Sequence, residues 1–235
     1  MTYAIADIHG CFDKYMQMLE KIGFCDNDML YVVGDVLDRG AEPMKVLHDM
    51  SMRANVIPLL GNHEYIAHEM LGQLLYELNE ENINKHFGGD LMNFARRVQE
   101  WTDIGGDTTM RSFGQLAMDE RLALVEYLGE FSLYETLIVN GQKYILTHAG
   151  LPAGATPGNL GRYDAWDYVT AEIDYKKTYF PDAFLVTGHL PTYVIDEVWR
   201  GRIYRENRHI AIDVGAVFGE ALGCVCLDTG EEFYV

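Results

Sequence analysis

Three short polar segments each follow an apolar run and carry side chains that bind metal ions or phosphate. They are residues 7–10 (Asp-Ile-His-Gly), 34–40 (Gly-Asp-Val-Leu-Asp-Arg-Gly) and 61–64 (Gly-Asn-His-Glu). Two later histidines, His148 and His189, also end apolar runs. Together these segments supply enough ligands for two divalent cations, and a pair of neighbouring cations is suited to cleaving phosphate esters with water. The spacing therefore predicts a binuclear hydrolytic centre.

The ligand types indicate how two cations would be shared. Asp7 and His9 are two residues apart, so an extended segment points both toward one cation. Asp35 can bridge two cations, and Asn62 offers an amide oxygen to the second. Two carboxylates neutralise only half of the four positive charges, and the remainder attracts phosphate. Mixed nitrogen and oxygen ligands favour manganese, with iron or zinc as alternatives. The predicted metal ligands are Asp7, His9, Asp35, Asn62, His148 and His189.

Three further side chains have the chemistry for binding phosphate and moving a proton. Arg39 follows Asp35 by four residues, and its planar guanidinium can hold two phosphate oxygens. His63 directly follows Asn62, so its ring can face the leaving oxygen and act as general acid. Asp38 can orient that ring and keep it protonated. The structural alternatives are an ion pair for Arg39 and a turn cap for Asp38. We expect water activated between the cations to attack phosphorus in line.

The elements that position these residues are read from the apolar pattern. Residues 3–6, 29–33 and 56–60 are typical of buried strands, and helical patterns at 12–22 and from Pro43 separate them. This alternation predicts parallel strands joined by crossover helices. Ligands of such sheets gather beyond the carboxyl ends of the strands. Sequence-distant motifs are therefore expected to converge there.

The rest of the chain changes character twice. Residues from about 65 to 128 form a helix-rich insert, and the last hundred residues are mainly extended. We expect an α/β fold of two mixed β-sheets packed as a sandwich flanked by helices, with the metal site at the C-terminal strand edges. Residues 1–235 would form a single domain. The expected late strands are 133–139, 144–147, 184–187, 194–198, 210–213, 223–227 and 231–235.

Composition restricts the partners. The 235 residues carry a net charge of −18, which would repel nucleic acid over most of the surface. The N-terminal segment lacks the pattern of a signal peptide, and no window reaches the ~18 apolar residues of a membrane span. The four cysteines match no zinc spacing and are expected to be reduced thiols. A cytoplasmic protein without nucleic-acid or membrane partners is expected. The oligomeric state stays open.

The order of these motifs resembles the metallo-dependent phosphoesterases. The resemblance is greatest to the phosphoprotein phosphatase (PPP-type) family, in its small bacterial and phage Ser/Thr branch. Its pattern is G-D-x-H-G, G-D-x-x-D-R-G, G-N-H-E and two single histidines; here Ala6 replaces the first glycine. Residues 212–219, and Trp101 followed by 105–112, also resemble that branch. The resemblance implies the two-sheet fold, the six metal ligands, phosphate binding by Arg39 and general acid catalysis by His63.

One feature of that branch is missing here. A second phosphate-binding arginine commonly follows a tryptophan between the two late histidines, but Trp166 is followed by Asp167 and Tyr168. Arg162, four residues before the tryptophan, is the nearest candidate to replace that arginine. The alternative is that Arg162 is simply a solvated loop residue. Leu190 also replaces the threonine of the usual G-H-T-P. The predicted phosphate-binding residues are Arg39, Asn62 and Arg162.

These observations predict a serine/threonine protein phosphatase that acts on a phosphorylated protein or a small phosphoester. The related symmetrical dinucleoside tetraphosphate hydrolases share the metal motifs but tend to lack the aspartate of D-R-G, and Asp38 is present here. Such a hydrolase is the first alternative. The second alternative is a non-catalytic phospho-binding scaffold of the same fold. Such a scaffold would be expected to lack some metal ligands, and none of the six is missing here.

Overall fold

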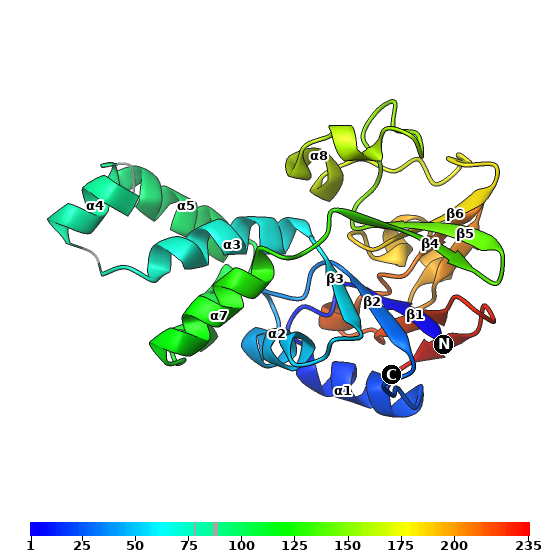
Figure 1. Ribbon diagram of the computed structural model, residues 1–235, viewed down its shortest axis with the longest axis horizontal. Coiled ribbons are helices and arrows are strands. Elements are labelled where there is room, and N and C mark those ends of the chain that lie inside the picture. Colours follow the sequence, from blue (N-terminus) through cyan, green and yellow to red (C-terminus); the bar gives the residue numbers. More distant parts are fainter. Residues whose placement is uncertain (78, 87–88) are drawn as a thin grey trace.

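The computed structural model describes residues 1–77, 79–86 and 89–235. Two five-stranded β-sheets pack together, and a group of helices projects from them as an arm (Figure 1). The first sheet has the order β10-β9-β1-β2-β3. Its strands β1, β2 and β3 are parallel, whereas β9 and β10 are antiparallel to their neighbours. Its members are β1 (Thr2–Ile5), β2 (Met29–Val33), β3 (Val56–Leu59), β9 (Gly223–Cys226) and β10 (Glu232–Tyr234).

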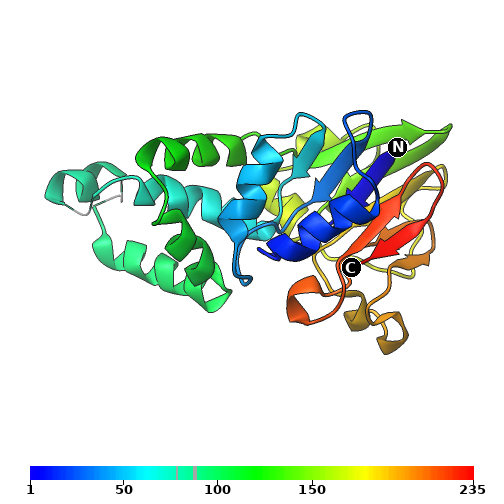
Figure 2. The ribbon, with the colours of Figure 1, turned by 90° about the horizontal axis from the view of Figure 1, so that it is seen from below.

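Two crossover helices pack against this sheet, as the parallel pairing requires (Figure 2). Helix α1 (Phe12–Lys21) buries Tyr15, Met18 and Leu19, which recur at helical spacing. Helix α2 (Pro43–Ser51) begins with proline at its first turn, where the missing N–H costs no hydrogen bond. The first helical pattern was thus predicted to within one residue.

The second sheet has the order β4-β5-β6-β8-β7. Strands β5, β6 and β8 are parallel, and β4 and β7 run antiparallel at the two edges. Asn140 and Gly141 join β4 to β5 in a two-residue turn with φ of 50° and 80°, which matches the twist of a hairpin. Its members are β4 (Tyr134–Val139), β5 (Gln142–Thr147), β6 (Ala183–Thr187), β7 (Tyr204–Glu206) and β8 (His209–Ala211).

An apolar core lies between the two sheets. Ala4, Val33 and Leu59 of the first sheet belong to one buried cluster with Val186 and Ile210 of the second. Burial of this apolar surface holds the sheets face to face and fixes which strand ends are neighbours. The expected sandwich of two mixed sheets flanked by helices is confirmed.

The predicted insert lies between β3 and β4 and forms the projecting arm (Figure 1). Its helices begin at Asn62, directly after β3, so the third motif opens the arm. Residues 78, 87 and 88 of the predicted insert lie outside the described residues. The helices are α3 (Asn62–Leu74), α4 (Glu80–His86), α5 (Leu91–Asp103), α6 (Gly106–Phe113) and α7 (Met118–Leu128).

One expected strand was wrong. Residues 194–198 run from the end of one 3₁₀ turn, η2 (Thr192–Val194), into a second, η3 (Glu197–Trp199). The Asp196 side chain accepts a hydrogen bond from Val198 N and caps the second turn, which competes with strand pairing. Three short helical segments were not anticipated: η1 (Leu160–Arg162), α8 (Ala165–Val169) and η4 (Ala216–Phe218). No helix in the described residues is long and apolar enough to span a membrane.

Candidate metal centre

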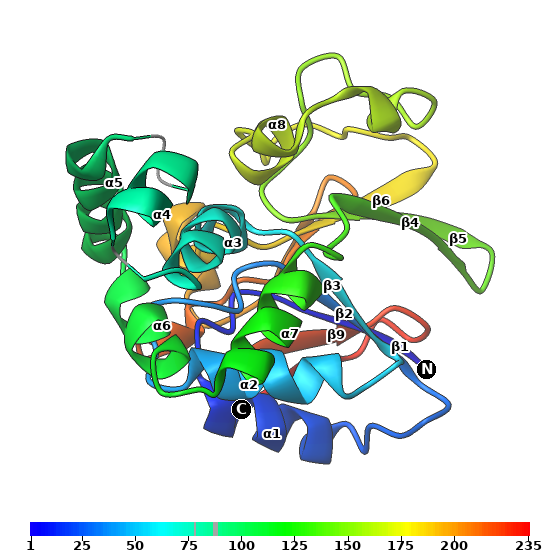
Figure 3. The same cartoon turned by 60° about the vertical axis from the view of Figure 1, so that its left-hand side comes forward.

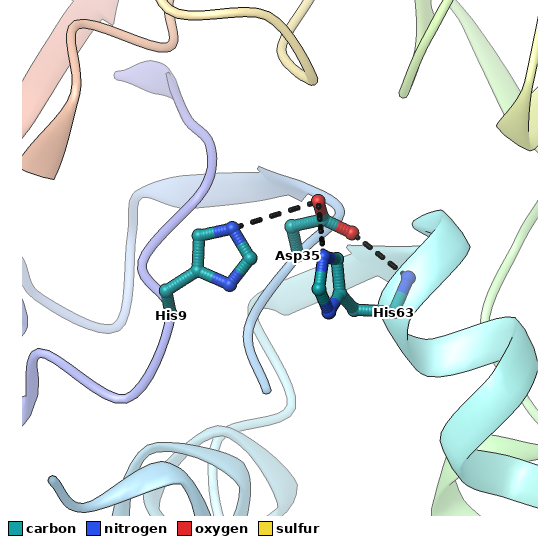
Figure 4. A group of neighbouring side chains, drawn as sticks. All are labelled: His9, Asp35 and His63. Carbon is teal, nitrogen blue, oxygen red and sulfur yellow. Dashed lines mark hydrogen bonds and ion pairs between the residues drawn. The ribbon is translucent and has the colours of Figure 1, made fainter. Parts of the chain in front are cut away.

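The predicted ligands come together where five strands end. Asp7 follows β1, Asp35 follows β2 and Asn62 follows β3, while His148 and His189 follow β5 and β6. Two groups of metal-ligating side chains form there, and in each the ligand atoms lie within 4.8 Å of one another. Both groups contain Asp35. They are His9, Asp35 and His63 (Figure 4), and Asp35, His148 and His189.

Asp35 lies between the two groups with one carboxylate oxygen toward each. Its Oδ2 is 3.6 Å from His9 Nε2, and its Oδ1 is 3.3 Å from His148 Nε2. Burial opposes ionisation, but His148 and His63 outweigh it and hold the pKa of Asp35 well below its usual range. The side chain is 2% exposed. A buried, ionised carboxylate with imidazoles on both sides is suited to bridging two cations.

The second group consists of acceptors that face one another. His148 donates its Nδ1 hydrogen to the Val33 carbonyl at 2.9 Å, which leaves a lone pair on Nε2. That nitrogen lies 3.0 Å from Asn62 Oδ1 and 3.2 Å from His189 Nδ1. Burial opposes protonation, yet Asp35 raises the pKa of His148, so the site favours a positive charge. These donor atoms fit a divalent cation, which would satisfy all of them at once.

The first group has the same character. His9 donates from Nδ1 to the Leu37 carbonyl at 2.7 Å, and burial lowers its pKa to about 3, so Nε2 carries a lone pair that could bind a metal ion. The Arg39 guanidinium donates to that nitrogen at 2.7 Å. Burial and the charges of Asp213 and Asp35 raise the pKa of Asp7 well above normal. This carboxyl therefore needs nearby positive charge to ionise.

The backbone is strained at these residues. Nine non-glycine residues of the described chain have positive φ, and three of them, Asn140, Asn207 and Arg208, lie in hairpin turns. Each of the remaining positions costs on the order of 1–3 kcal/mol, and such strain clusters at functional sites. The six strained residues, with φ between 43° and 73°, are Asp7, His9, Asp35, Asp38, Arg39 and His189.

Two motif glycines leave room for the ligands. A Cβ at Gly61 would collide with the Asp35 carboxylate, and one at Gly188 would collide with the carboxylate of Asp7. The Asp7 carboxylate instead accepts the backbone N–H of His189 at 3.0 Å. The glycines before Asn62 and His189 therefore have a steric cause.

Glu64 was not assigned a role from the sequence, yet it holds the loop that carries Asp35. Its carboxylate accepts the backbone N–H groups of Asp35, Val36 and Leu37 at 2.7, 2.8 and 2.9 Å. It also accepts that of Gly61 at 3.2 Å, as the third residue of a capping box. The side chain is fully buried. Glutamate at the third helical position was the available signal, because such residues bind free N–H groups.

His63 and Asp38 form a buried pair. His63 Nδ1 lies 2.7 Å from Asp38 Oδ2, and both side chains are at most 1% exposed. Burial alone would lower the pKa of His63, but Asp35 and Asp38 outweigh it and raise the pKa. His63 Nε2 faces the Arg39 guanidinium at 2.9 Å. Asp38 thus fixes the His63 ring, and the general-acid role of His63 stays a prediction.

The helical arm braces this pair. Trp101 Nε1 donates to Asp38 Oδ2 at 2.9 Å, and Thr109 Oγ1 donates to Asp38 Oδ1 at 2.6 Å. The Arg39 backbone N–H donates to the Gly105 carbonyl at 2.9 Å. In the sequence, Trp101 and residues 105–112 stood out only through their resemblance to the phosphatase branch. No local pattern reveals these contacts, which join residues 63 and 71 positions apart.

Arg39 and Arg162 have different surroundings. Arg39 is exposed at the centre, and its guanidinium lies 5.4 Å from the ring centroid of Phe218. Arg162 is exposed in η1, and no hydrogen bond or ion pair joins it to the centre within the described residues. The structure brings together every predicted site residue except Arg162, whose phosphate-binding role stays a prediction.

Comparison with known proteins agrees with this geometry. A relative from Halalkalibacterium halodurans, named asymmetrical bis(5'-nucleosyl)-tetraphosphatase PrpE, is 26% identical and the alignment covers 93% of this chain and 86% of the relative. A relative from Buchnera aphidicola subsp. Baizongia pistaciae, named symmetrical bis(5'-nucleosyl)-tetraphosphatase, is 45% identical over 65 residues, 27% of this chain and 23% of the relative. The protein phosphatase branch is not confirmed, because these names match the alternative class better.

Solved structures share the fold. A structure described as a putative diadenosine tetraphosphatase has a TM-score of 0.65 at 15% identity and covers 100% of this chain and 92% of its own. A protein serine/threonine phosphatase from Saccharomyces cerevisiae has a TM-score of 0.57 at 14% identity, with coverage of 100% and 79%.

Calcineurin-like phosphoesterases use divalent metal ions, and the two groups around Asp35 provide candidate ligands for them here. The model of that family matches residues 2–218, nearly the whole chain. The chain therefore belongs to the calcineurin-like phosphoesterase family.

Proposed function

We propose that this chain is a metal-dependent hydrolase of dinucleoside tetraphosphates. The observation that carries the hydrolytic part is the pair of ligand groups that share the buried Asp35. The substrate class is supported by relatives that carry a tetraphosphatase name and align over 93% of this chain. A dinucleoside tetraphosphate therefore replaces a phosphoprotein as the first choice of substrate, because the choice of a phosphoprotein rested mainly on Asp38.

Six side chains would hold two divalent cations. When bound, such a pair supplies an activated water and withdraws charge from the phosphate oxygens. Asp35 would bridge the cations, and Glu64 keeps Asp35 in place through its backbone N–H contacts. The proposed ligands are Asp7, His9, Asp35, Asn62, His148 and His189.

The remaining groups bind the substrate and handle its proton. Arg39 is exposed, and its guanidinium lies within 3 Å of both His9 and His63, so it would be close enough to bind a phosphate beside the centre. Asn62 would make a second phosphate contact. His63 would hand its Nε2 proton to the leaving oxygen, and Asp38 fixes the ring by accepting from Nδ1.

Phosphoprotein hydrolysis is the second candidate, and the buried His63–Asp38 pair favours it. A serine or threonine alkoxide leaves poorly without a proton. A nucleoside phosphate leaves as a stable anion whose own pKa is near 6, so it needs an acid much less. A chain with a fully buried acid pair is therefore also equipped for phosphomonoesters of alcohols.

The experiment compares substrates on one manganese-loaded preparation. The panel is diadenosine tetraphosphate, a phosphothreonine peptide and p-nitrophenyl phosphate, with nucleotide products separated by chromatography. The proposal predicts the highest kcat/KM for the dinucleotide. Monophosphate with triphosphate would indicate asymmetrical cleavage, and two diphosphates symmetrical cleavage. Strong turnover of the peptide alone would overturn the substrate class. A metal-loaded protein that turns over none of them would support the scaffold alternative.

A further inference from the structure

Two exposed aromatic side chains, Tyr65 and Trp166, have no part in the chemistry described above. Tyr65 is 38% exposed and Trp166 is 51% exposed. Their ring centroids are 5.5 Å apart and the ring planes are inclined by 54°. Because the rings are tilted rather than stacked, neither covers the face of the other. An exposed aromatic pair of this kind is typical of a recognition surface.

The chain places Tyr65 beside the metal ligands. Asn62 and Tyr65 are three residues apart in the first turns of α3, so their side chains share one face of the helix. Asn62 Oδ1 in turn lies 3.0 Å from both His148 Nε2 and His189 Nδ1. A group attached to a phosphate at the centre therefore has Tyr65 one helical turn away.

Trp166 reaches the same place from a different part of the chain. It lies in α8, which belongs to the connection between His148 and His189 and packs against α3 (Figure 3). Tyr168 and Val169 are buried and anchor α8, and the Tyr168 hydroxyl donates to the Leu160 carbonyl at 2.5 Å. Trp166 lies on the same anchored helix but stays half exposed, with its ring beside that of Tyr65 on α3.

The net negative charge of the chain suggests how the Tyr65–Trp166 pair could contribute to binding. A net charge of −18 opposes the approach of a polyphosphate, so charge pairing must stay local to the metals and Arg39. A nucleobase is flat and uncharged, and it gains affinity by stacking on aromatic rings whatever the surrounding field. Tyr65 and Trp166 are flat, exposed and adjacent to the phosphate site.

We propose that Tyr65 and Trp166 form the stacking surface for a nucleobase of the substrate. The inference rests on the proposed function, since it assumes a nucleotide substrate, and adds the residues that select it. Both are specificity-determining rather than catalytic residues, because they do not touch the reacting phosphate. Their removal should weaken binding of the base and leave the chemical step unchanged.

The test is steady-state kinetics of the manganese-loaded Tyr65→Ala and Trp166→Ala variants with diadenosine tetraphosphate. Inorganic tripolyphosphate, which has no base, serves as a competitive inhibitor. Each variant should raise KM about tenfold, in line with the loss of one base–aromatic contact. The kcat and the inhibition constant of tripolyphosphate should stay unchanged. Tyr65→Phe and Trp166→Phe should restore most of the affinity.

A matched control is Tyr76→Ala. Tyr76 is 42% exposed and its ring stacks on that of His86, with ring centroids 3.5 Å apart, in the projecting arm. The Tyr76→Ala variant should have the KM and kcat of the wild type. An unchanged KM in the Tyr65 and Trp166 variants would overturn the inference, and so would an equal weakening of tripolyphosphate, which would indicate a structural role.

A second comparison separates this inference from the proposed function. If the wild type does not cleave diadenosine tetraphosphate, the proposed function has failed. Adenosine 5'-monophosphate and inorganic phosphate are then compared as inhibitors of p-nitrophenyl phosphate turnover. Weaker inhibition of Trp166→Ala by the nucleotide alone would support base stacking. Equal inhibition of variant and wild type by the nucleotide, or a raised KM for a phosphothreonine peptide, would overturn it.

Discussion

Replacing Glu64 with glutamine tests whether one buried carboxylate holds Asp35, the proposed bridging ligand, in place. The substitution keeps the shape of the side chain but removes its charge and turns one acceptor oxygen into a donor N–H₂. Four backbone N–H groups point at the two oxygens, from Asp35, Val36, Leu37 and Gly61. Oε2 accepts from Asp35 and Gly61, and Oε1 accepts from Val36 and Leu37. Whichever oxygen is replaced, two N–H groups therefore lose their acceptor.

The magnitude follows from these contacts. Each buried N–H group left without an acceptor costs about 1–3 kcal/mol, so the variant should lose about 2–6 kcal/mol of unfolding free energy. That is a large share of the ~5–15 kcal/mol by which proteins are usually stable. Asp35 also has a strained φ of 53°, and a freed loop would relax away from it. Metal affinity should therefore fall by about 10- to 100-fold.

Urea unfolding of the metal-free protein measures the first effect, and manganese titration of the folded protein measures the second. Glu120→Gln is the matched control. Glu120 occupies the same third position of α7, but it is exposed and accepts one backbone N–H, from Ala117 at 2.9 Å. We expect the control to change stability by less than about 0.5 kcal/mol. A loss below about 1 kcal/mol in Glu64→Gln, with metal affinity unchanged, would refute the positioning role.

Three further predictions concern the acid, the metals and a buried histidine. His63→Asn should keep its metal content but lose about 10²- to 10⁴-fold in kcat on a phosphothreonine peptide or another alkyl phosphate, and an unchanged kcat would contradict the acid assignment. Chelation with EDTA should abolish turnover and lower the Tm, manganese should restore both, and Asp35→Asn should respond to neither treatment. Burial lowers the pKa of His209 to about 4, below the 6.5 of the unfolded chain, so between these pH values the unfolded chain binds more protons. Urea unfolding should therefore show stability falling as pH drops from 6.5 to 4, by up to about 1.4 kcal/mol per pH unit, with a flatter profile in His209→Gln.

Much of the centre could be predicted because the ligands are attached to regular elements. Apolar runs identified β1, β2 and β3 to within one residue at either end, and parallel strands place their carboxyl ends together. Asp7, Asp35 and Asn62 therefore had to be neighbours once the strands paired. The wrong strand at 194–198 shows where this approach fails, since apolar residues in a short turn resemble those of a strand.

The substrate class could not be predicted in the same way. Asp38 favoured a protein phosphatase, whereas the relatives that align with nearly the whole chain carry tetraphosphatase names. Asp38 pairs with His63, the proposed acid, and that proposed role concerns the proton rather than the part of a substrate beyond the phosphate. The residues suited to that contact, Tyr65 and Trp166, are 101 positions apart, and no sequence pattern links them. Their proximity at 5.5 Å appears only after α8 folds onto α3.

The sequence by itself determined the ligand types, the strands that carry them and the edge at which they gather, because each depends on local spacing. Only the tertiary structure decided the supporting contacts: Glu64 on the Asp35 loop, and Trp101 and Thr109 on Asp38. It also imposed positive φ on six centre residues that are not glycine. Such strain is disfavoured locally and persists because long-range hydrogen bonds and packing outweigh it, which no local pattern records.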